Sequence, residues 1–217
     1  MPLARRKYSD VPDRVVDRET ELVIEGFQRS GNTFAVFAFE SAQEREVKTA
    51  HHLHAAAQIV AAAGMGIPTL VLIRDPQEAV LSQMVREQGV GAGQALANWI
   101  RFYERVLRYR DRVIIAGFDQ VTSDFGRVIR AVNERFDTKF AEFEHTDANV
   151  ERCFDLIEQR NRERYGVISE PTVARPSAER DVLKDAVRQR YEVDRHARLR
   201  ARASGVYRAL VPSPSVS

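Results

Sequence analysis

Apolar residues along the chain fall into two patterns, short unbroken runs and longer segments in which they recur every three or four positions. Unbroken runs are typical of strands buried on both faces of a parallel sheet, and the longer period is typical of helices. The predicted strands cover residues 21–27, 46–49, 69–73 and 113–116. The predicted helices cover residues 33–44, 55–63, 76–86, 94–109, 124–136, 149–165 and 178–203. Strands that alternate with helices in this way predict an α/β fold, a three-layer sandwich with a mainly parallel central sheet.

The length of 217 residues fits one domain with a substantial hydrophobic core. Residues 1–20 are polar, and we expect them to form a flexible N-terminal arm. Residues 21–205 carry all the predicted strands and helices and form the single domain. Residues 206–217 end in the sequence VPSPSVS and are expected to be a disordered tail.

Composition limits the partners and the compartment. The net charge of +2 gives no reason to expect a nucleic-acid partner. A single cysteine, Cys153, excludes an intramolecular disulfide and indicates a reducing compartment, so we expect a cytoplasmic protein. The N-terminal sequence MPLARRKYSD lacks the apolar stretch of a secretory signal. The most apolar region, residues 55–73, is interrupted by Gly64, Gly66 and Pro68 and predicts a helix and a strand rather than a membrane span.

The loop after the first predicted strand has the residues of an anion-binding loop. Gly26, Gly31 and Thr33 fit most of the phosphate-loop pattern G-x-x-x-x-G-K-S/T of P-loop NTPases, but Asn32 stands where the pattern requires lysine. Backbone N–H groups around a glycine turn, together with the positive end of the following helix, form a cradle for an anion. Because the lysine is missing, an ordinary nucleoside triphosphatase is disfavoured. A cation is present inside the loop, at Arg29.

Three chemical signals follow three different predicted strands. The loop at Gly26 follows the first strand, the histidines 51, 52 and 54 follow the second, and Arg74 follows the third. The carboxyl ends of parallel strands meet at one edge of a sheet, where such sheets bind their ligands. The sequence therefore predicts one ligand site built from these three segments.

Three stretches resemble segments of a known family. The sequence QRSGNTF, residues 28–34, resembles the 5′-phosphosulfate loop of sulfotransferases, commonly written P-K-S-G-T-T-W. The sequence IRDPQEAVLS, residues 73–82, looks like the family's 3′-phosphate motif, with Arg74 at a strand end and Ser82 about two turns inside the next helix. The sequence VIIAGFDQVTSD, residues 113–124, is similar to a later strand and turn of the family. The resemblance covers roughly residues 21–136.

The resemblance implies that 3′-phosphoadenosine-5′-phosphosulfate is the sulfuryl donor and that the acceptor, a small molecule or a glycan, carries a hydroxyl or an amine. It implies a fold like that of the P-loop NTPases. The transfer reaction that it implies requires no metal. The nucleotide-binding residues that it implies are Arg29, Ser30, Gly31, Asn32, Thr33, Phe34, Arg74 and Ser82. The family's C-terminal motif R-K-G-x-x-G is not evident, and Arg175 and Arg180 are expected to supply cations to the 3′-phosphate in its place.

The resemblance also implies catalytic residues. The segment VKTAHHLH resembles the family's strand-end K-T-H sequence, so His52 or His51 is expected to remove the acceptor proton, with Lys48 assisting. Arg29 replaces the family's loop lysine and would neutralise charge on the oxygen that leaves with the nucleotide. The alternative is that these histidines are loop or helix-cap residues without a catalytic role. His52 and His54 lack a further ligand at a recognisable spacing, so no metal site is predicted.

Several residues have a second, purely structural interpretation. Phe34 either stacks on adenine or belongs to the core, and Arg74 either binds phosphate or pairs with Glu78. The helical stripe of Trp99, Phe102 and Tyr103 is either core or acceptor pocket. Two rival functions also stay open, a P-loop-type kinase or nucleoside triphosphatase and a non-catalytic nucleotide-binding domain.

Overall fold

The computed structural model of the protein describes residues 14–166 and 178–211. Its strands are β1 (Leu22–Gly26), β2 (Thr49–His51), β3 (Thr69–Ile73) and β4 (Ile114–Gly117). Its α-helices are α2 (Asn32–Ala42), α3 (Ala56–Met65), α4 (Pro76–Arg86), α5 (Ala92–Leu107), α6 (Phe118–Ser123), α7 (Phe125–Phe136), α8 (Asp147–Tyr165), α9 (Ala178–Glu192) and α10 (Ala197–Leu210). None of the helices in these ranges combines the length and the apolar composition that crossing a bilayer requires.

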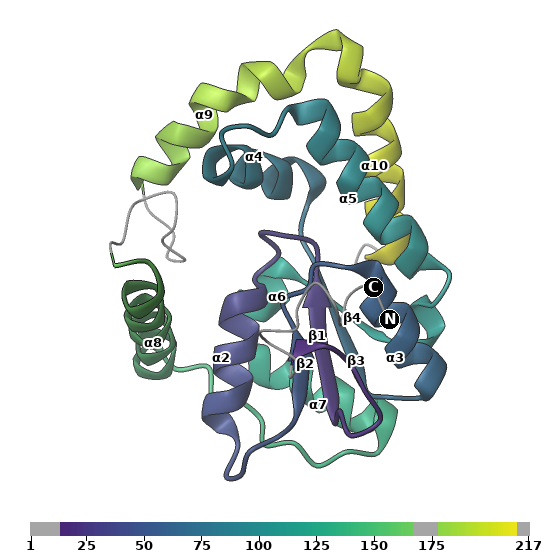
Figure 1. The fold of residues 1–217 in the computed structure, drawn as a ribbon, viewed down its shortest axis with the longest axis vertical. Coiled ribbons are helices and arrows are strands. Elements are labelled where there is room, and N and C mark those ends of the chain that lie inside the picture. The colour runs from purple at the N-terminus through teal and green to yellow at the C-terminus, as the bar shows by residue number, and fades with distance from the viewer. Residues whose placement is uncertain (1–13, 167–177, 212–217) are drawn as a thin grey trace, which may run out of the picture.

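The four strands form one parallel sheet in the order β2-β1-β3-β4 (Figure 1). Strand β1 lies in the middle, with Val23 opposite Ala50 of β2 and Ile24 opposite Leu70 of β3. The chain passes from β1 to β2 on one side and then to β3 on the other, so the loops after β1 and β3 flank the point where the strand order reverses. In open parallel sheets this point is where ligands bind.

Helices cover both faces of the sheet, which explains why the strands are unbroken apolar runs. One face is packed by α2, α6, α7 and α8, and its strand residues are Leu22, Ile24, Leu70, Leu72 and Ala116. The other face is packed by α3, α4, α5 and α10, and its strand residues include Val71 and Ile73. The structure therefore confirms the predicted α/β class, a parallel sheet between two helical layers.

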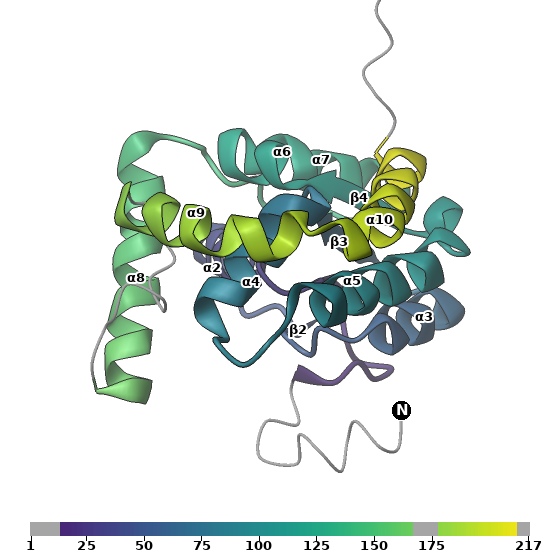
Figure 2. The ribbon, with the colours of Figure 1, turned by 90° about the horizontal axis from the view of Figure 1, so that it is seen from above.

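The C-terminal region differs from the single helix predicted over residues 178–203. It forms two helices, α9 and α10, separated by a short 3₁₀ turn at Asp194–His196. Helix α9 lies against α4 and α10 lies against α5. The pair arches over one end of the molecule in Figure 1, and Figure 2 shows the same helices from above. Helix α10 continues to Leu210, and because Val206 and Leu210 are buried, residues 206–210 belong to the packed domain rather than to a tail.

The described part of the expected N-terminal arm is also packed. Val15 and Val16 are buried, and the backbone N–H of Val16 donates to Oε1 of Gln58 on α3 at 3.0 Å. Residues 14–20 are therefore held on the domain, whose packed region begins before residue 21.

The second strand lies later in the chain than predicted. It covers Thr49–His51 instead of residues 46–49, and charged residues before it make ion pairs. Arg45 pairs with Glu21, and Lys48 pairs with Asp17 at 2.9 Å and with Glu19 at 2.8 Å. This shift places His51 at the carboxyl end of the strand and Lys48 at its amino end.

Candidate nucleotide site

Two glycines shape the loop between β1 and α2. A Cβ atom on Gly26 would lie 2.4 Å from the carbonyl oxygen of Leu72, so no side chain fits where β1 and β3 approach each other. Gly31 has φ +88° at the N-cap of α2, a left-handed conformation that glycine adopts without strain. Among the described residues no side chain caps α2, so its first backbone N–H groups can face an anion.

Tyr103 of α5 supports this loop from inside the protein. Its buried hydroxyl donates to the carbonyl oxygen of Leu72 at 2.7 Å and accepts from the backbone N–H of Phe27 at 3.2 Å. It also lies 3.2 Å from Oγ of Ser30, and burial raises the pKa of this tyrosine. Trp99, Phe102 and Tyr103 therefore belong to the core. The supporting role of Tyr103 has one signal in the sequence, a hydroxyl group on an otherwise apolar helix face.

The cationic residues predicted from separate motifs meet at this loop. Nε of Arg29 donates to Oγ of Ser82 on α4 at 2.9 Å, and Nη1 of Arg74 donates to the carbonyl oxygen of Arg29 at 3.3 Å. Ser82 is buried, so its hydroxyl reaches the loop from within the domain. The segments after β1 and β3 are thus joined by direct contacts, as the strand order predicts.

Arg74 makes the pair with Glu78 that the sequence analysis gave as its structural interpretation, and it also contacts the loop. Its guanidinium lies 4.0 Å from the centre of the Phe118 ring, at the start of α6, and its Nη2 lies 3.5 Å from Oε2 of Glu78. The same Glu78 oxygen accepts from Nζ of Lys184 on α9 at 3.0 Å. Arg74 is therefore held from several sides against the loop, and Phe118 is a site residue that the sequence analysis missed.

Asn32 replaces the phosphate-loop lysine and points inward. Its side-chain amide donates to the carbonyl oxygen of Phe27 at 3.0 Å, and only 4% of the residue is exposed. Its Oδ1 atom is buried without a hydrogen-bond partner among the described residues. Asn32 closes the loop on itself, which is a different task from holding the outer phosphates of a nucleoside triphosphate.

The predicted histidines lie beside the same loop, in the segment after β2. Nε2 of His52 lies 3.2 Å from Oγ1 of Thr33 on α2, and Nδ1 of His52 lies 2.7 Å from Nδ1 of His51. Burial is the main cause that lowers the pKa of both imidazoles, to about 4 for His51 and well below the usual value for His52. Both rings are consequently neutral at neutral pH, the form that can accept a proton.

Strained backbone is concentrated here. Arg29, His52 and His54 have φ values of 66°, 57° and 50°, in the left-handed region that residues other than glycine rarely adopt. In the described ranges only one other such residue occurs, Asp137 at the C-cap of α7. Backbone strain of this kind costs about 1–3 kcal/mol per residue and is typically found at functional sites.

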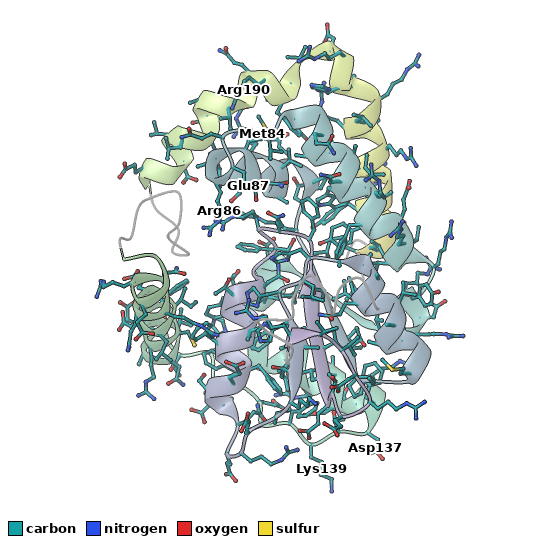
Figure 3. All side chains as sticks on the ribbon, in the orientation of Figure 1. Met84, Arg86, Glu87, Asp137, Lys139 and Arg190 are labelled. Atoms are coloured by element: carbon teal, nitrogen blue, oxygen red, sulfur yellow. The ribbon has the colours of Figure 1, made fainter. Side chains whose placement is uncertain are left out.

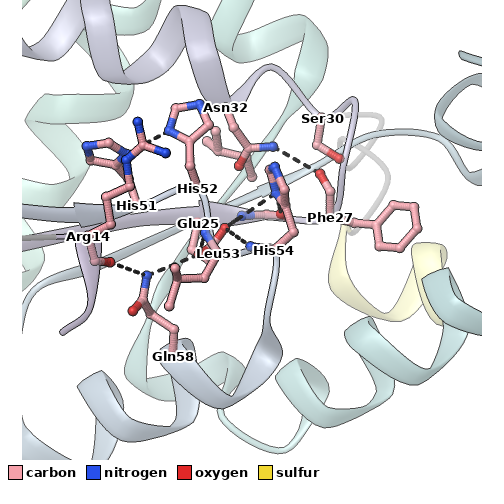
Figure 4. A network of polar contacts seen from close by, with 12 residues as sticks. Arg14, Glu25, Phe27, Ser30, Asn32, His51, His52, Leu53, His54 and Gln58 are labelled. Carbon is pink, nitrogen blue, oxygen red and sulfur yellow. Dashed lines mark hydrogen bonds and ion pairs between the residues drawn. The ribbon is translucent and has the colours of Figure 1, made fainter. Parts of the chain in front are cut away.

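A buried carboxylate supports the histidine segment (Figure 4). Oε1 of Glu25 accepts from the backbone N–H groups of Gly26 at 3.2 Å and His54 at 3.1 Å. Oε2 accepts from the backbone N–H of Leu53 at 3.0 Å and from Nε2 of Gln58 at 3.1 Å. Burial raises the pKa of Glu25 to about 7, while these four donors favour its ionised form. Sequence reasoning missed this residue because it sits in an otherwise apolar strand.

Two residues predicted for the site lie elsewhere, and two fall where the structure does not describe them. Phe34 is buried in an aromatic cluster with Phe125, Phe143, Phe154 and His145, so its role is packing. Lys48 makes its ion pairs at the other end of β2. Arg175 lies outside the described residues, and Arg180 lies in α9 with its side chain also outside them.

The side chains labelled in Figure 3 mark the two ends of the molecule. Figure 3 places Glu87 at the end of α4, above the sheet edge that carries the loops, and Asp137 and Lys139 at the far end of the molecule. Among the described residues no group of three or more histidine, cysteine, aspartate or glutamate side chains is arranged to hold a metal ion.

Comparisons with known proteins find a distant likeness among solved structures. No protein-family model matches the chain, and no curated protein matches it. Among solved structures, the chain is similar to mouse sulfotransferase SULT7A1 complexed with PAP, with a TM-score of 0.44 and 10% identity over 89% of this chain and 91% of that chain. Because this similarity is so distant, the site is interpreted from its own residues.

Proposed function

We propose that the protein binds 3′-phosphoadenosine-5′-phosphosulfate at this sheet edge and transfers its sulfuryl group to a hydroxyl or an amine. The observation that carries the proposal is the contact of Arg29 with both Ser82 and Arg74. The two sequence motifs that resemble the phosphate-binding motifs of sulfotransferases belong to different parts of the chain, and these contacts join them.

Each group at the site has a task in this proposal. The backbone N–H groups at the start of α2 and the Thr33 hydroxyl would hold oxygens of the 5′-phosphosulfate. Arg74 and Ser82 would bind the 3′-phosphate. The Ser82 hydroxyl, which accepts a hydrogen bond from Arg29 in this structure, would then contact the phosphate instead. Arg29, once released, would stabilise charge on the leaving phosphate oxygen.

A neutral histidine beside the loop would remove the acceptor proton, and the sequence resemblance assigns this task to His52. His52 lies within hydrogen-bond distance of Thr33, so it stands next to the residues proposed to hold the sulfuryl group. The acceptor is proposed to be a small molecule or a glycan. With one cysteine and no disulfide, a cytoplasmic location remains part of the proposal.

Two other functions compete with this proposal. A P-loop-type kinase or nucleoside triphosphatase needs a cation that reaches the outer phosphates, and the Asn32 side chain is turned into the loop instead. A non-catalytic nucleotide-binding domain would keep the cradle but show no turnover. The inward orientation of Asn32 disfavours the kinase or nucleoside triphosphatase. Assays of turnover distinguish the non-catalytic domain from the proposed sulfotransferase.

Calorimetric titration tests the proposal. We expect 3′-phosphoadenosine 5′-phosphate to bind at least tenfold more tightly than adenosine 5′-phosphate, and Mg²⁺-ATP to bind no more tightly than adenosine 5′-phosphate. A preference for Mg²⁺-ATP would favour the kinase. Binding of none of the three nucleotides would refute the proposal.

A further inference from the structure

The three histidines near the loop differ in how their ring nitrogens are engaged. Both nitrogens of His52 have partners, since Nδ1 lies 2.7 Å from His51 and Nε2 lies 3.2 Å from the Thr33 hydroxyl. If Nδ1 accepts, then Nε2 carries the proton and donates to Thr33. If Nδ1 donates, then the Nε2 lone pair accepts from Thr33. In either tautomer, His52 must break a hydrogen bond before it takes a proton from an acceptor.

His54 is held in one defined tautomer. Its Nδ1 lies 2.9 Å from the carbonyl oxygen of Gly26, and a carbonyl oxygen only accepts, so Nδ1 must carry the proton. The lone pair of the ring is therefore on Nε2. Among the described residues Nε2 has no hydrogen-bond partner. His54 thus has a free basic nitrogen while its other nitrogen is fixed.

Glu25 positions this ring. It accepts from the backbone N–H of His54, and its Oε1 lies 3.6 Å from Nδ1 of the same residue. The carboxylate is fully buried, whereas 27% of the His54 side chain is exposed. A carboxylate at this distance stabilises the imidazolium that forms when Nε2 gains a proton, as in other histidine–carboxylate pairs.

The other charged groups near His54 have opposite effects. Burial lowers its pKa most, Arg29 and Arg14 lower it further, and Glu87 raises it. The neighbouring ring of His52 is 5.9 Å away, measured between ring centroids. His54 is therefore neutral at neutral pH. Its pKa is also affected by the charge of Arg29, the residue proposed to stabilise the leaving oxygen. Figure 4 shows its ring on the same side of the strand end as Ser30 and Phe27 of the loop.

We propose that His54, positioned by Glu25 and Gly26, is the catalytic base, in place of His52. Nε2 of His54 takes the proton of the acceptor hydroxyl or amine as the acceptor atom forms a bond to sulfur. The bond from sulfur to the 5′-phosphate oxygen breaks, and its electron pair stays on that oxygen beside Arg29. The products are the sulfated acceptor, 3′-phosphoadenosine 5′-phosphate and protonated His54. This inference rests on the proposed function.

Matched asparagine variants test the assignment. His52 and His54 both have left-handed backbones, which asparagine tolerates, and an asparagine at position 54 retains an amide that can donate to Gly26. Turnover is measured as release of inorganic sulfate from the donor, with water as the acceptor. We expect His54→Asn to lower turnover by about 100-fold or more, and His52→Asn by about tenfold or less. His196→Asn on the far C-terminal turn is the control and should leave turnover unchanged.

The affinity for 3′-phosphoadenosine 5′-phosphate separates catalysis from folding and binding. It should stay within about twofold of wild type in both variants, because neither ring is proposed to hold the nucleotide. A His54→Asn variant that binds nucleotide and keeps its turnover would overturn the proposal, as would a larger loss in His52→Asn.

Chemical labelling tests the geometry without any turnover. Diethyl pyrocarbonate acylates a neutral imidazole at an available lone pair, and peptide mass mapping gives the order of modification. His54 should react faster than His51 and His52 in the unliganded protein, and more slowly in Glu25→Gln. Faster labelling of His52 would contradict the assignment. If the wild-type protein binds no nucleotide but labels first at His54, the proposed function fails while the geometry of the histidine stands.

Discussion

The loop after β1 and the segment after β2 stand side by side but are built in different ways. The first, residues 26–31, depends on two glycines, on backbone N–H groups and on a tyrosine hydroxyl beneath it. The second, residues 51–54, has no glycine and places two histidines in a left-handed backbone. It is held by one buried carboxylate, Glu25. We propose that the first segment receives an anion, whereas the buried Glu25 holds the second segment and its rings in place.

The residues that hold a site in place are therefore harder to recognise from the sequence than the residues that form the site. Gly26 and Gly31 are visible in the sequence because their spacing is a local pattern. Glu25 supports residues 28 and 29 positions away, and nothing near it in the sequence indicates that partnership. Variants that disturb one segment at a time distinguish the two kinds of support.

Arg29→Ala should have the largest effect, because it removes the only loop cation that we place at the leaving oxygen. Turnover should fall about 100- to 1,000-fold, the usual loss when a donor to a developing oxyanion is removed. The measurement is sulfate release at saturating donor, with Arg101→Ala, an exposed arginine on α5, as the control. Turnover within threefold of wild type would remove Arg29 from the transfer step.

Glu25→Gln breaks the histidine segment. In the wild-type protein both oxygens of the Glu25 side chain accept hydrogen bonds. The glutamine side chain has an NH₂ group in place of one oxygen, and this group cannot accept, so at least one buried donor loses its acceptor. The free energy of unfolding should fall by about 1–3 kcal/mol, as measured by urea denaturation. Glu21→Gln is the matched control, since its partner Arg45 is on the surface and its loss should cost less than about 1 kcal/mol. An unchanged denaturation midpoint would show that Glu25 does not fix the segment.

Tyr103→Phe removes the internal support of the loop after β1. Removing the hydroxyl leaves the Leu72 carbonyl, the Phe27 N–H and the Ser30 hydroxyl without this partner. We expect a loss of about 1–2 kcal/mol in unfolding free energy, together with weaker nucleotide binding. Tyr109→Phe, a partly buried tyrosine after α5, is the control. Stability lost without any change in nucleotide affinity would show that the tyrosine does not shape the loop.

Stability should also depend on pH, with opposite contributions from the two kinds of buried group. The pKa values of His51, His52 and His54 are lowered on folding, so the unfolded chain binds more protons below the usual histidine pKa and acid favours unfolding. The pKa of Glu25 is raised to about 7, so its own contribution to stability is lost as pH rises from 4.5 toward 7.

Of these groups, three histidines oppose Glu25, so the net unfolding free energy should fall as pH drops from about 6.5 to 4.5, by roughly 1–3 kcal/mol per pH unit. Urea denaturation at several pH values gives this slope. Replacing His51 by Asn should reduce it, and a slope of zero or of opposite sign would contradict the assigned pKa directions.

Lys48→Ala should have the smallest effect. The sequence resemblance gives Lys48 a catalytic role, but its ammonium group makes partly exposed ion pairs with Asp17 and Glu19 at the amino end of β2. We expect a stability change within about 0.5 kcal/mol and turnover within threefold of wild type. A loss of turnover beyond tenfold would return Lys48 to the site.

The sequence was informative where the determinants are local. Unbroken apolar runs identified β1 and β3, and the order of motifs placed Arg29, Arg74 and Ser82 at one edge. It was less informative where distant contacts decide. The bounds of β2 are set by its pairing with Leu22–Ile24 of β1, and Phe34 was assigned to packing only by its aromatic neighbours.

The long-range supports were invisible for the same reason. Tyr103 is separated from Phe27 by 76 residues along the chain, and Phe118 meets Arg74 across the sheet edge. The break between α9 and α10 was missed because both helices are highly charged and their period alone continues through residues 194–196.

We propose that the segments after β1 and β3 form one site for a nucleotide with a 3′-phosphate. The most direct measurement is the ratio of affinities for 3′-phosphoadenosine 5′-phosphate and adenosine 5′-phosphate, compared between the wild-type protein and Arg74→Ala. We predict a ratio of at least ten in the wild type and a ratio near one in the variant, with adenosine 5′-phosphate binding little changed. A ratio that Arg74→Ala leaves unaltered would contradict the account.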